Sequence, residues 1–349
     1  MLITTIDLKE EHKKRNFSLI SEYVQTAIIE SLQKGKKVIL LHNRIGYARR
    51  VYCKDCKTLQ VCTECGSPLL CHDDEKKDAP ISNTLLLCRL CKKNFSDFLC
   101  PVCQSALKKF HGYGIDRLKH DVQSRITKSV HSISAKIPNI HDLIVLSNEY
   151  DIVIGTHLPA SDTIENDTSP FLLCAVINAD TDFYLPDFRA SVRVFNRLTA
   201  CIQSARAWGF KECIIQTYLP THFAITTSAS HDIKSLYAQE IETRKQANYP
   251  PWSSLIKLIC QKKSASLAHK EAETVYDRLK KMEKETPLQS IEISPPHPAF
   301  VPLVRSMWRY HIVIKCIKPL HKPTVQKIKT FLSTLPQQWL IDVDPISLL

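Results

Sequence analysis

The sequence predicts an α/β protein: a parallel sheet with an inserted cysteine module, followed by a smaller α+β domain. Before residue 249, apolar strand-like runs alternate with amphipathic helical patterns, as in parallel sheets of the RecA or Rossmann type. Nine of the 14 cysteines fall between Cys53 and Cys103, which marks a separate module. The rigid break Tyr249-Pro250-Pro251 precedes a further stretch of ordinary domain size.

The chain before the cysteine module predicts one helix and one buried strand. Between Ser18 and Leu32, apolar residues recur at helical spacing, and Gly35 is placed to end that helix. Residues Lys37–His42 read KVILLH, a short apolar run that is typical of a buried strand. The module is therefore expected as an insertion after the first strand.

After the module, strands and helices continue to alternate. The predicted strands are Leu143–Leu146, Asp151–Ile154, Leu172–Ile177 and Cys213–Thr217. The predicted helices are Ile115–Ile126, Arg189–Trp208 and Ile233–Ala247. We expect a first domain over residues 1–50 and 112–232, with the module at 51–111.

Residues 233–349 form the predicted carboxy-terminal domain. Its expected strands are Leu255–Gln261, Ile291–Ser294, His311–Cys316 and Gln338–Val343, and its expected helices are Ser266–Lys284 and Lys322–Leu335. A proline-rich loop is expected after Ser294. This order predicts a βαβ-type α+β domain.

The charge balance indicates a polyanionic partner. Lys and Arg number 47 against 35 Asp and Glu, which leaves a formal charge of +12. Nucleic acid is the first partner to expect from such a balance. The charged residues 1–16 contain no secretory leader, and no apolar run approaches the length of a membrane span. We expect a cytoplasmic monomer with no membrane contact.

The scarcity of glycine excludes a self-contained phosphate loop. The chain has only 7 glycines, and neither GxxxxGK[ST] nor GxGxxG can be assembled from them. Gly112 and Gly114 give GYG, but Leu118 stands near the place where a third glycine would be needed. The 349 residues therefore contain no complete site for nucleotide phosphates of either kind.

Four C-x-x-C pairs predict two structural zinc sites. The pairs are Cys53/Cys56, Cys62/Cys65, Cys88/Cys91 and Cys100/Cys103. The turn in each pair points two thiolates at one place, and two pairs complete a tetrahedral four-cysteine site with no open position for catalysis. Redox pairs and iron–sulfur clusters are the alternatives. The spacing leaves sequential, interleaved and nested pairing open, although nested pairing avoids closing a site across the short gap 57–61.

The remaining cysteines and the basic residues near the module need no metal to explain them. Cys174, Cys201, Cys213, Cys260 and Cys316 lie mostly in apolar runs and are expected to be small buried residues. The module is flanked by lysines and arginines, among them Arg44, Arg49 and Arg50. These cations are either a solvated face or a surface that contacts phosphate groups.

Several blocks, in order along almost the whole chain, carry a family resemblance. They are Leu41-His42-Asn43-Arg44-Ile45-Gly46-Tyr47-Ala48, the four C-x-x-C pairs, Gly112-Tyr113-Gly114-Ile115-Asp116-Arg117-Leu118, Asp187-Phe188-Arg189-Ala190, Tyr249-Pro250-Pro251-Trp252-Ser253, Arg305-Ser306-Met307-Trp308-Arg309-Tyr310 and Asp342-Val343-Asp344-Pro345. This series resembles the PriA family of primosomal replication-restart DNA helicases. The resemblance implies a RecA-like second helicase lobe, a two-zinc insertion with nested ligands and a carboxy-terminal DNA-binding domain.

Two departures from the family pattern argue against ATP chemistry in this chain. The family's GTQ…KG motif stands here as residues 155–162, GTHLPASD, without its Lys-Gly. Its QxxGRxGR motif, which should supply arginine fingers to the γ-phosphate, is replaced by residues 201–208, CIQSARAW. Arg206 is the one candidate for a displaced finger. The expected function is therefore DNA binding without helicase activity.

The predicted DNA contacts are Arg305, Trp308, Arg309, Tyr310, Arg44, Arg49 and Arg50. In residues 305–310, cations alternate with aromatics as phosphate contact plus base stacking would require, whereas Trp308 and Tyr310 are alternatively core residues of the next strand. The resemblance thus implies a replication-restart protein that binds forked or single-stranded DNA and supports primosome assembly at stalled forks. Single-strand-binding protein and other primosome proteins are further partners that the resemblance implies. The alternative is an ATP-dependent 3′–5′ helicase subunit completed in trans by a separate first lobe.

Overall fold

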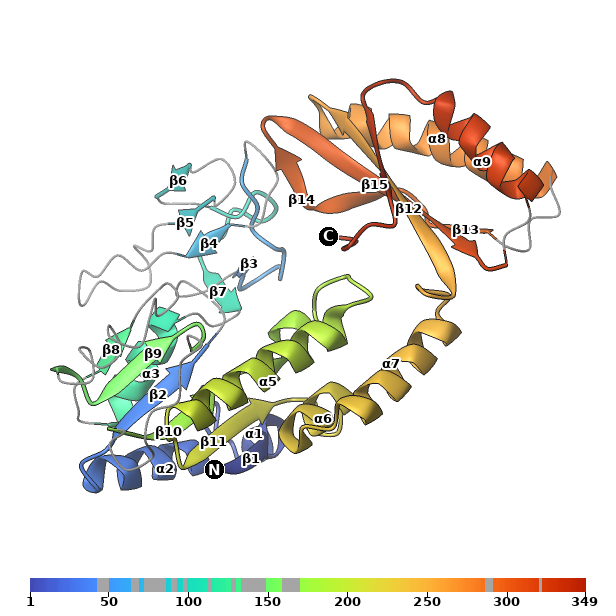
Figure 1. The fold of residues 1–349 in the computed structure, drawn as a ribbon. Coiled ribbons are helices and arrows are strands. Elements are labelled where there is room, and N and C mark those ends of the chain that lie inside the picture. The colour runs from blue at the N-terminus through green and yellow to red at the C-terminus, as the bar shows by residue number, and fades with distance from the viewer. Residues whose placement is uncertain are drawn as a thin grey trace. The chain divides into compact units, whose positions relative to one another are not determined.

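A computed structural model of the chain describes residues 1–42, 50–63, 69–71, 86–88, 93–96, 99–111, 115–126, 130–132, 149–158, 170–285, 291–319 and 322–349 (Figure 1). The chain divides into two compact units. The first comprises Met1–Phe183 and Val192–Ile233, and the second comprises Tyr184–Ser191 and Lys234–Leu349. Among the described residues, no helix is both long and apolar enough to cross a bilayer.

The first unit contains a six-stranded sheet of order β1-β11-β10-β2-β9-β8. The strands are β1 (Leu2–Asp7), β2 (Lys37–Leu41), β8 (Val130–Ser132), β9 (Ile152–Gly155), β10 (Phe171–Val176) and β11 (Glu212–Thr217). Every pairing between neighbours in this sheet is parallel. Parallel strands need helical connections, which is why apolar strands alternate with helices along the sequence. The predicted parallel α/β architecture is confirmed.

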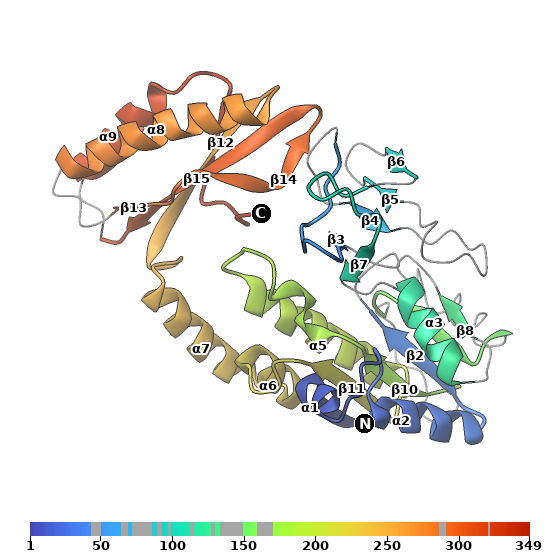
Figure 2. The ribbon, with the colours of Figure 1, turned by 180° about the vertical axis from the view of Figure 1, so that it is seen from behind.

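Helices pack on both faces of the sheet because its strands are apolar on both sides. On one face, α2 (Glu22–Gln33) and α3 (Ile115–Arg125) bury residues such as Val24 and Leu118 against Leu40 and Ala175. Strand residues of the opposite parity face α5 (Ala190–Ala207), which runs beside β10 and β11 in Figures 1 and 2. Further helical segments of this unit are α1 (Leu8–Lys13), the 3₁₀ turn η2 (Ala179–Asp182) and α6 (Phe223–Ser230), whereas α7 (Ile233–Gln246) lies almost wholly in the second unit.

The amino-terminal strand is an element that the sequence reasoning missed. Residues Leu2–Asp7 pair with β11 along their full length and form the edge of the sheet. An edge strand needs apolar residues on only part of its surface, and the charged residues that follow in α1 obscured this short β-branched run. The predicted strand Leu143–Leu146 lies outside the described residues.

The second unit is an antiparallel sheet covered by two helices on one face. Its path is β13-β15-β12-β16, and β14 pairs with β15. The strands are β12 (Ser253–Lys262), β13 (Ile291–Ile293), β14 (His297–Val304), β15 (Met307–Ile317) and β16 (Trp339–Val343), and the helices are α8 (Ala265–Glu285) and α9 (Lys322–Ser333). Both helices contribute to one apolar cluster with the sheet. The predicted α+β class is confirmed: the four predicted strands and two predicted helices occur in the predicted order, with β14 as a further strand.

The expected proline-rich loop after Ser294 was wrong, because β14 occupies His297–Val304. Among the described strands, β14 pairs with β15 alone, and its register shifts between Pro298 and Leu303. Proline removes a backbone donor and is therefore tolerated on an edge strand that carries such an irregularity. The strand β15 likewise begins at Met307, four residues before the predicted start at His311.

Residues Tyr184–Ser191 cluster with the second unit, whereas the sequence placed them in the first domain. The Phe188 ring stacks on Tyr249 at a centroid distance of 5.1 Å. The guanidinium of Arg244 lies 5.1 Å from the centre of the same ring. Such aromatic and cation–π contacts form between residues far apart in sequence, so the local sequence pattern could not predict them.

Candidate metal centre

The two ends of the cysteine module are joined by a short antiparallel ladder. Strand β3 (Arg50–Cys53) pairs with β7 (Lys108–His111), with Cys53 opposite Lys108. This pairing brings the first C-x-x-C pair close to the last one, although 50 residues separate Cys53 from Cys103. The segments β4 (Leu70–Cys71), β5 (Leu86–Leu87) and β6 (Asn94–Phe95) form a separate small sheet.

Four thiols converge where the first and last pairs meet. The Sγ atoms of Cys53 and Cys103 are 3.5 Å apart, as are those of Cys56 and Cys100. All four Sγ atoms lie within 4.8 Å of one another. A zinc tetrahedron with Zn–S bonds of about 2.3 Å has edges of about 3.8 Å. The donor type, number and spacing therefore fit a structural zinc site with four cysteine ligands.

This grouping corresponds to the outer half of the nested pairing. The remaining predicted ligands are Cys62, Cys65, Cys88 and Cys91. Cys62 and Cys88 are buried, whereas Cys65 and Cys91 lie outside the described residues. The second predicted zinc site therefore stays a prediction.

The first cysteine of three C-x-x-C pairs forms the same kind of backbone hydrogen bond. The amide of the first cysteine donates to the carbonyl five residues later: Cys53 to Thr58 at 2.9 Å, Cys88 to Lys93 at 2.8 Å and Cys100 to Ser105 at 3.0 Å. The residue after the second cysteine is left-handed in both turns of the four-thiol cluster, with φ of 60° at Lys57 and 58° at Gln104. This repetition shows that the sequence builds the same thiol-presenting turn more than once.

Polar neighbours that the sequence reasoning missed surround the four thiols. The side-chain amide of Gln60 lies 3.6 Å from Cys100 Sγ and also donates to the Thr58 carbonyl at 2.8 Å. The Thr58 hydroxyl is 3.2 Å from Cys56 Sγ. Hydrogen bonds with the Thr58 side chain and backbone lower the pKa of Cys56 to about 6. This favours the thiolate that a metal ion requires.

The left-handed residues give a testable stability change. Replacing Lys57 or Gln104 with glycine is expected to leave metal binding intact and stabilise the metal-bound module by up to about 1 kcal/mol, because glycine adopts positive φ without a Cβ penalty. The measurement is the guanidinium midpoint of the zinc-loaded chain. Valine at the same positions is the opposing control and should lower the midpoint. A glycine variant as unstable as the valine variant would contradict this explanation.

The four predicted DNA contacts near β15 do not share one surface. Arg305 is exposed and forms the turn between β14 and β15 with Ser306, at φ of 51° and 61°. Tyr310 packs against the apolar cluster beneath the helices, 5.2 Å from the ring of His269. Because side chains alternate along a strand, Trp308 points to the same side and Arg309 to the opposite one.

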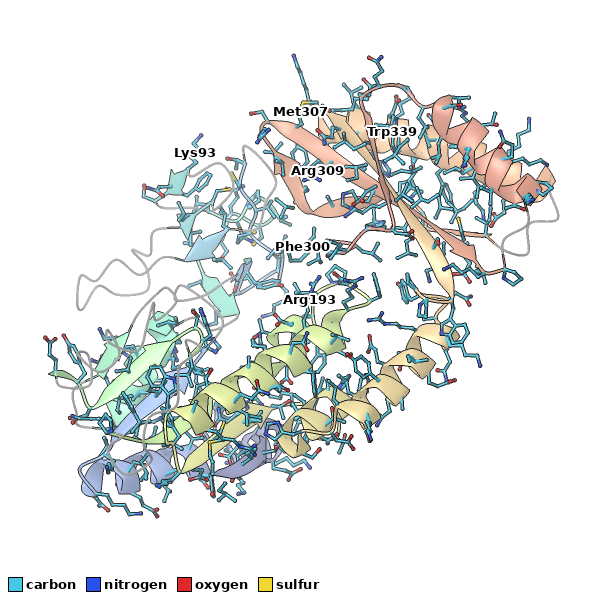
Figure 3. All side chains as sticks on the ribbon, viewed as in Figure 1. Lys93, Arg193, Phe300, Met307, Arg309 and Trp339 are labelled. Atoms are coloured by element: carbon cyan, nitrogen blue, oxygen red, sulfur yellow. The ribbon has the colours of Figure 1, made fainter. Side chains whose placement is uncertain are left out.

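The face opposite the helices carries Arg309 and the buried His311. Arg309 Nε is buried and has no hydrogen-bond partner among the described residues. Figure 3 shows Trp339 on the helix-covered side of this sheet and Arg309 toward β14. Of the other predicted contacts, Arg44 and Arg49 lie outside the described residues, and Arg50 is the first residue of β3.

Aromatic side chains that the sequence reasoning did not single out line a cavity in the second unit. Its volume is about 720 Å³, and its walls include Phe188, Tyr249, His297, Phe300 and Lys315. Phe300, labelled in Figure 3, is 49% exposed. The ammonium group of Lys315 lies 4.1 Å from the centre of the Tyr249 ring. Lys315 is also paired with Glu292 at 3.3 Å, and Glu292 and Asp187 line the same cavity, so the cavity combines aromatic surfaces with charges of both signs.

Residues 155–158 and 201–208, described parts of the two segments that the sequence analysis compared with ATP motifs, lie at the end of a strand and at the end of a helix. Gly155 ends β9, and the Thr156 hydroxyl lies 2.9 Å from His157 Nδ1. Residues 201–207 continue α5, with Cys201, Ile202 and Ala205 in the core, and Trp208 is also buried. Arg206 is exposed in the last turn of α5.

Comparisons with known proteins show which proteins the chain is similar to. Residues 245–346 match the family described as primosomal protein N C-terminal domain. The chain is 29% identical to replication restart protein PriA of Borreliella burgdorferi, over 98% of this chain and 51% of that protein. The PriA proteins of Chlamydia pneumoniae and Bacillus subtilis are 29% and 26% identical, over 97% and 90% of this chain and 45% and 38% of their own lengths. The chain spans about half the length of the curated relatives it matches, and it resembles the carboxy-terminal half of replication restart protein PriA.

Proposed function

We propose that this chain binds forked or single-stranded DNA in the cytoplasm and supports primosome assembly at stalled replication forks, without unwinding DNA itself. The observation that carries the proposal is the similarity to replication restart proteins over 98% of the chain, in a sequence that contains no GxxxxGK[ST]. On this proposal the four-thiol cluster holds zinc and keeps the module folded. Single-strand-binding protein and other primosome proteins are the proposed partners.

Two features of the second unit support the proposal of DNA binding. The β14–β15 turn presents Arg305 to solvent, where its guanidinium is free to approach a phosphate group. Strand β14 also presents Phe300 to the cavity that contains Lys315. Stacking of a base on an aromatic ring is worth about 1–3 kcal/mol, and every base has a face to stack. Together these features suit a single strand better than a base-paired major groove.

Fork binding by fluorescence anisotropy tests the proposal. Arg305→Ala is expected to weaken binding to all sequences and to reduce the steepness of the salt dependence by about one phosphate contact, because each contact releases counterions. Phe300→Ala should weaken single-strand binding by about tenfold. Trp308→Ala is expected to have little direct effect on DNA, because Trp308 shares the helix-covered side of the sheet.

Lys270→Ala is the matched control for charge, since this exposed lysine lies on α8, away from the β14–β15 turn in the sequence. It should leave binding nearly unchanged. Wild-type binding that does not depend on salt would contradict the phosphate contacts. Equal losses for Arg305→Ala and Lys270→Ala would show that net charge, rather than the turn, carries the affinity.

The same preparation separates the second candidate function from the first. Arg206 is exposed on α5, as a displaced arginine finger would need to be. If the chain is a helicase subunit, mixing it with a separate first lobe should produce DNA-stimulated ATPase, and Arg206→Ala should abolish it. We expect no ATPase from the chain alone. Hydrolysis by the purified chain would contradict the proposal that it does not unwind DNA.

A further inference from the structure

A second group of thiols lies in the core of the first unit, outside the C-x-x-C module. It consists of Cys174 on β10, Cys201 on α5 and Cys213 on β11. Cys174 and Cys213 are fully buried, and Cys201 is 8% exposed. The sequence analysis took each of them for an isolated apolar residue, because 27 residues separate even the first two.

Strand pairing and helix packing bring the three thiols together. Cys174 and Cys213 are directly opposite each other in the parallel pairing of β10 with β11. Neighbours in register project to the same face of a sheet. Cys201 approaches that face from α5, with its Sγ atom 3.9 Å from that of Cys174. All three Sγ atoms lie within 4.8 Å of one another.

This spacing fits a three-coordinate metal ion. In a planar trigonal site with metal–sulfur bonds of about 2.3 Å, the sulfur atoms are about 4.0 Å apart. The group contains no fourth His, Cys, Asp or Glu donor among the described residues. Structural zinc takes four ligands, whereas Cu(I) is a soft ion for which thiolates are preferred ligands.

We propose that Cys174, Cys201 and Cys213 form a three-thiolate site for a soft, thiophilic metal ion of the Cu(I) class. Binding would form three sulfur–metal bonds and release the thiol protons to solvent, with no change of oxidation state. A bound ion would link α5 to the two strands. The site is independent of the proposed DNA-binding function.

The test is Cu(I) titration of the zinc-loaded full chain against a competing Cu(I) chelator, with zinc measured in parallel. Wild type is expected to take up one Cu(I) while its zinc content stays unchanged. Cys201→Ala and Cys213→Ala should abolish this uptake. Cys260→Ala and Cys316→Ala are matched controls, because these cysteines are also buried but lie outside the group. They should bind Cu(I) as wild type does.

X-ray absorption on the Cu(I)-loaded wild type makes the result independent of how well the variants fold. Three sulfur neighbours around copper, with the zinc content unchanged, would support the site. Loss of zinc on copper loading, whatever the number of sulfur neighbours, would place the copper in the C-x-x-C module and overturn the proposal. Equal uptake by wild type and Cys201→Ala would overturn it as well.

Discussion

Cys100→Ala is expected to release one of the two zinc ions proposed for this chain and to unfold the part of the module built on β3 and β7. Cys100 is buried and lies 3.5 Å from Cys56 within the four-thiol cluster. A small module of short strands has little apolar core of its own, so its folding depends on the metal. Zinc-binding free energies in such modules are about 10–16 kcal/mol, which makes this the largest single effect that we expect.

Metal analysis of the purified variant, with amide exchange over residues 50–63 and 99–111, measures both consequences. Cys53→Ala should behave like Cys100→Ala, because both belong to the same cluster. Cys71→Ala is the matched control, since Cys71 belongs to none of the C-x-x-C pairs, and it should retain both ions. Full zinc content in Cys100→Ala would contradict the assignment of this cluster as a zinc site.

Gln216→Leu is expected to destabilise the first unit by about 4 kcal/mol. Gln216 is fully buried, and its side chain satisfies three backbone groups from two separate segments. Its Oε1 accepts from the amide of Ser21 at 2.7 Å, and its Nε2 donates to the carbonyls of Leu19 and Ile177 at 2.9 Å each. Leucine would leave all three buried groups unpaired, at about 1–3 kcal/mol apiece.

Urea denaturation followed by far-ultraviolet circular dichroism measures this change. Gln239→Leu is the control, because Gln239 is exposed on α7 and its replacement should change stability by less than about 0.5 kcal/mol. Gln216→Glu should destabilise at least as strongly at neutral pH, since a buried carboxylate would face the carbonyl oxygens of Leu19 and Ile177. A loss below about 1 kcal/mol in Gln216→Leu would show that water replaces the side chain.

The elements with strong local signals were predicted well. The helix α2 follows the predicted periodic run and has Ser21 as its N-cap, where the Ser21 hydroxyl accepts from the Val24 amide. The apolar runs at Lys37–Leu41 and Glu212–Thr217 became central strands of the sheet. Two strands with weak local patterns were not predicted. The charged residues that follow β1 obscured its short apolar run, and the prolines of β14 led to the prediction of a loop.

For the thiol cluster and for residues 305–310, the sequence predicted which residue types are present but not how their side chains are arranged. The C-x-x-C spacing identified a thiol-rich module and left the pairing of its cysteines open. The β3–β7 ladder is what places Cys53 beside Cys103. In residues 305–310 the alternation of cations and aromatics was visible, but the strand separates Tyr310 and Arg309 onto opposite faces.

The sequence by itself determined most of the helices and the internal strands, the spacing of the C-x-x-C pairs and the absence of a phosphate-loop motif, because each of these depends on neighbouring residues. Only the tertiary structure decided which distant side chains meet. It places Cys53 beside Cys103 and brings Cys174, Cys201 and Cys213 within 4.8 Å of one another. It also places the Gln216 side chain against the start of α2. The physical reason is that strand register and helix packing are set by the burial of whole faces, and no local pattern contains that information.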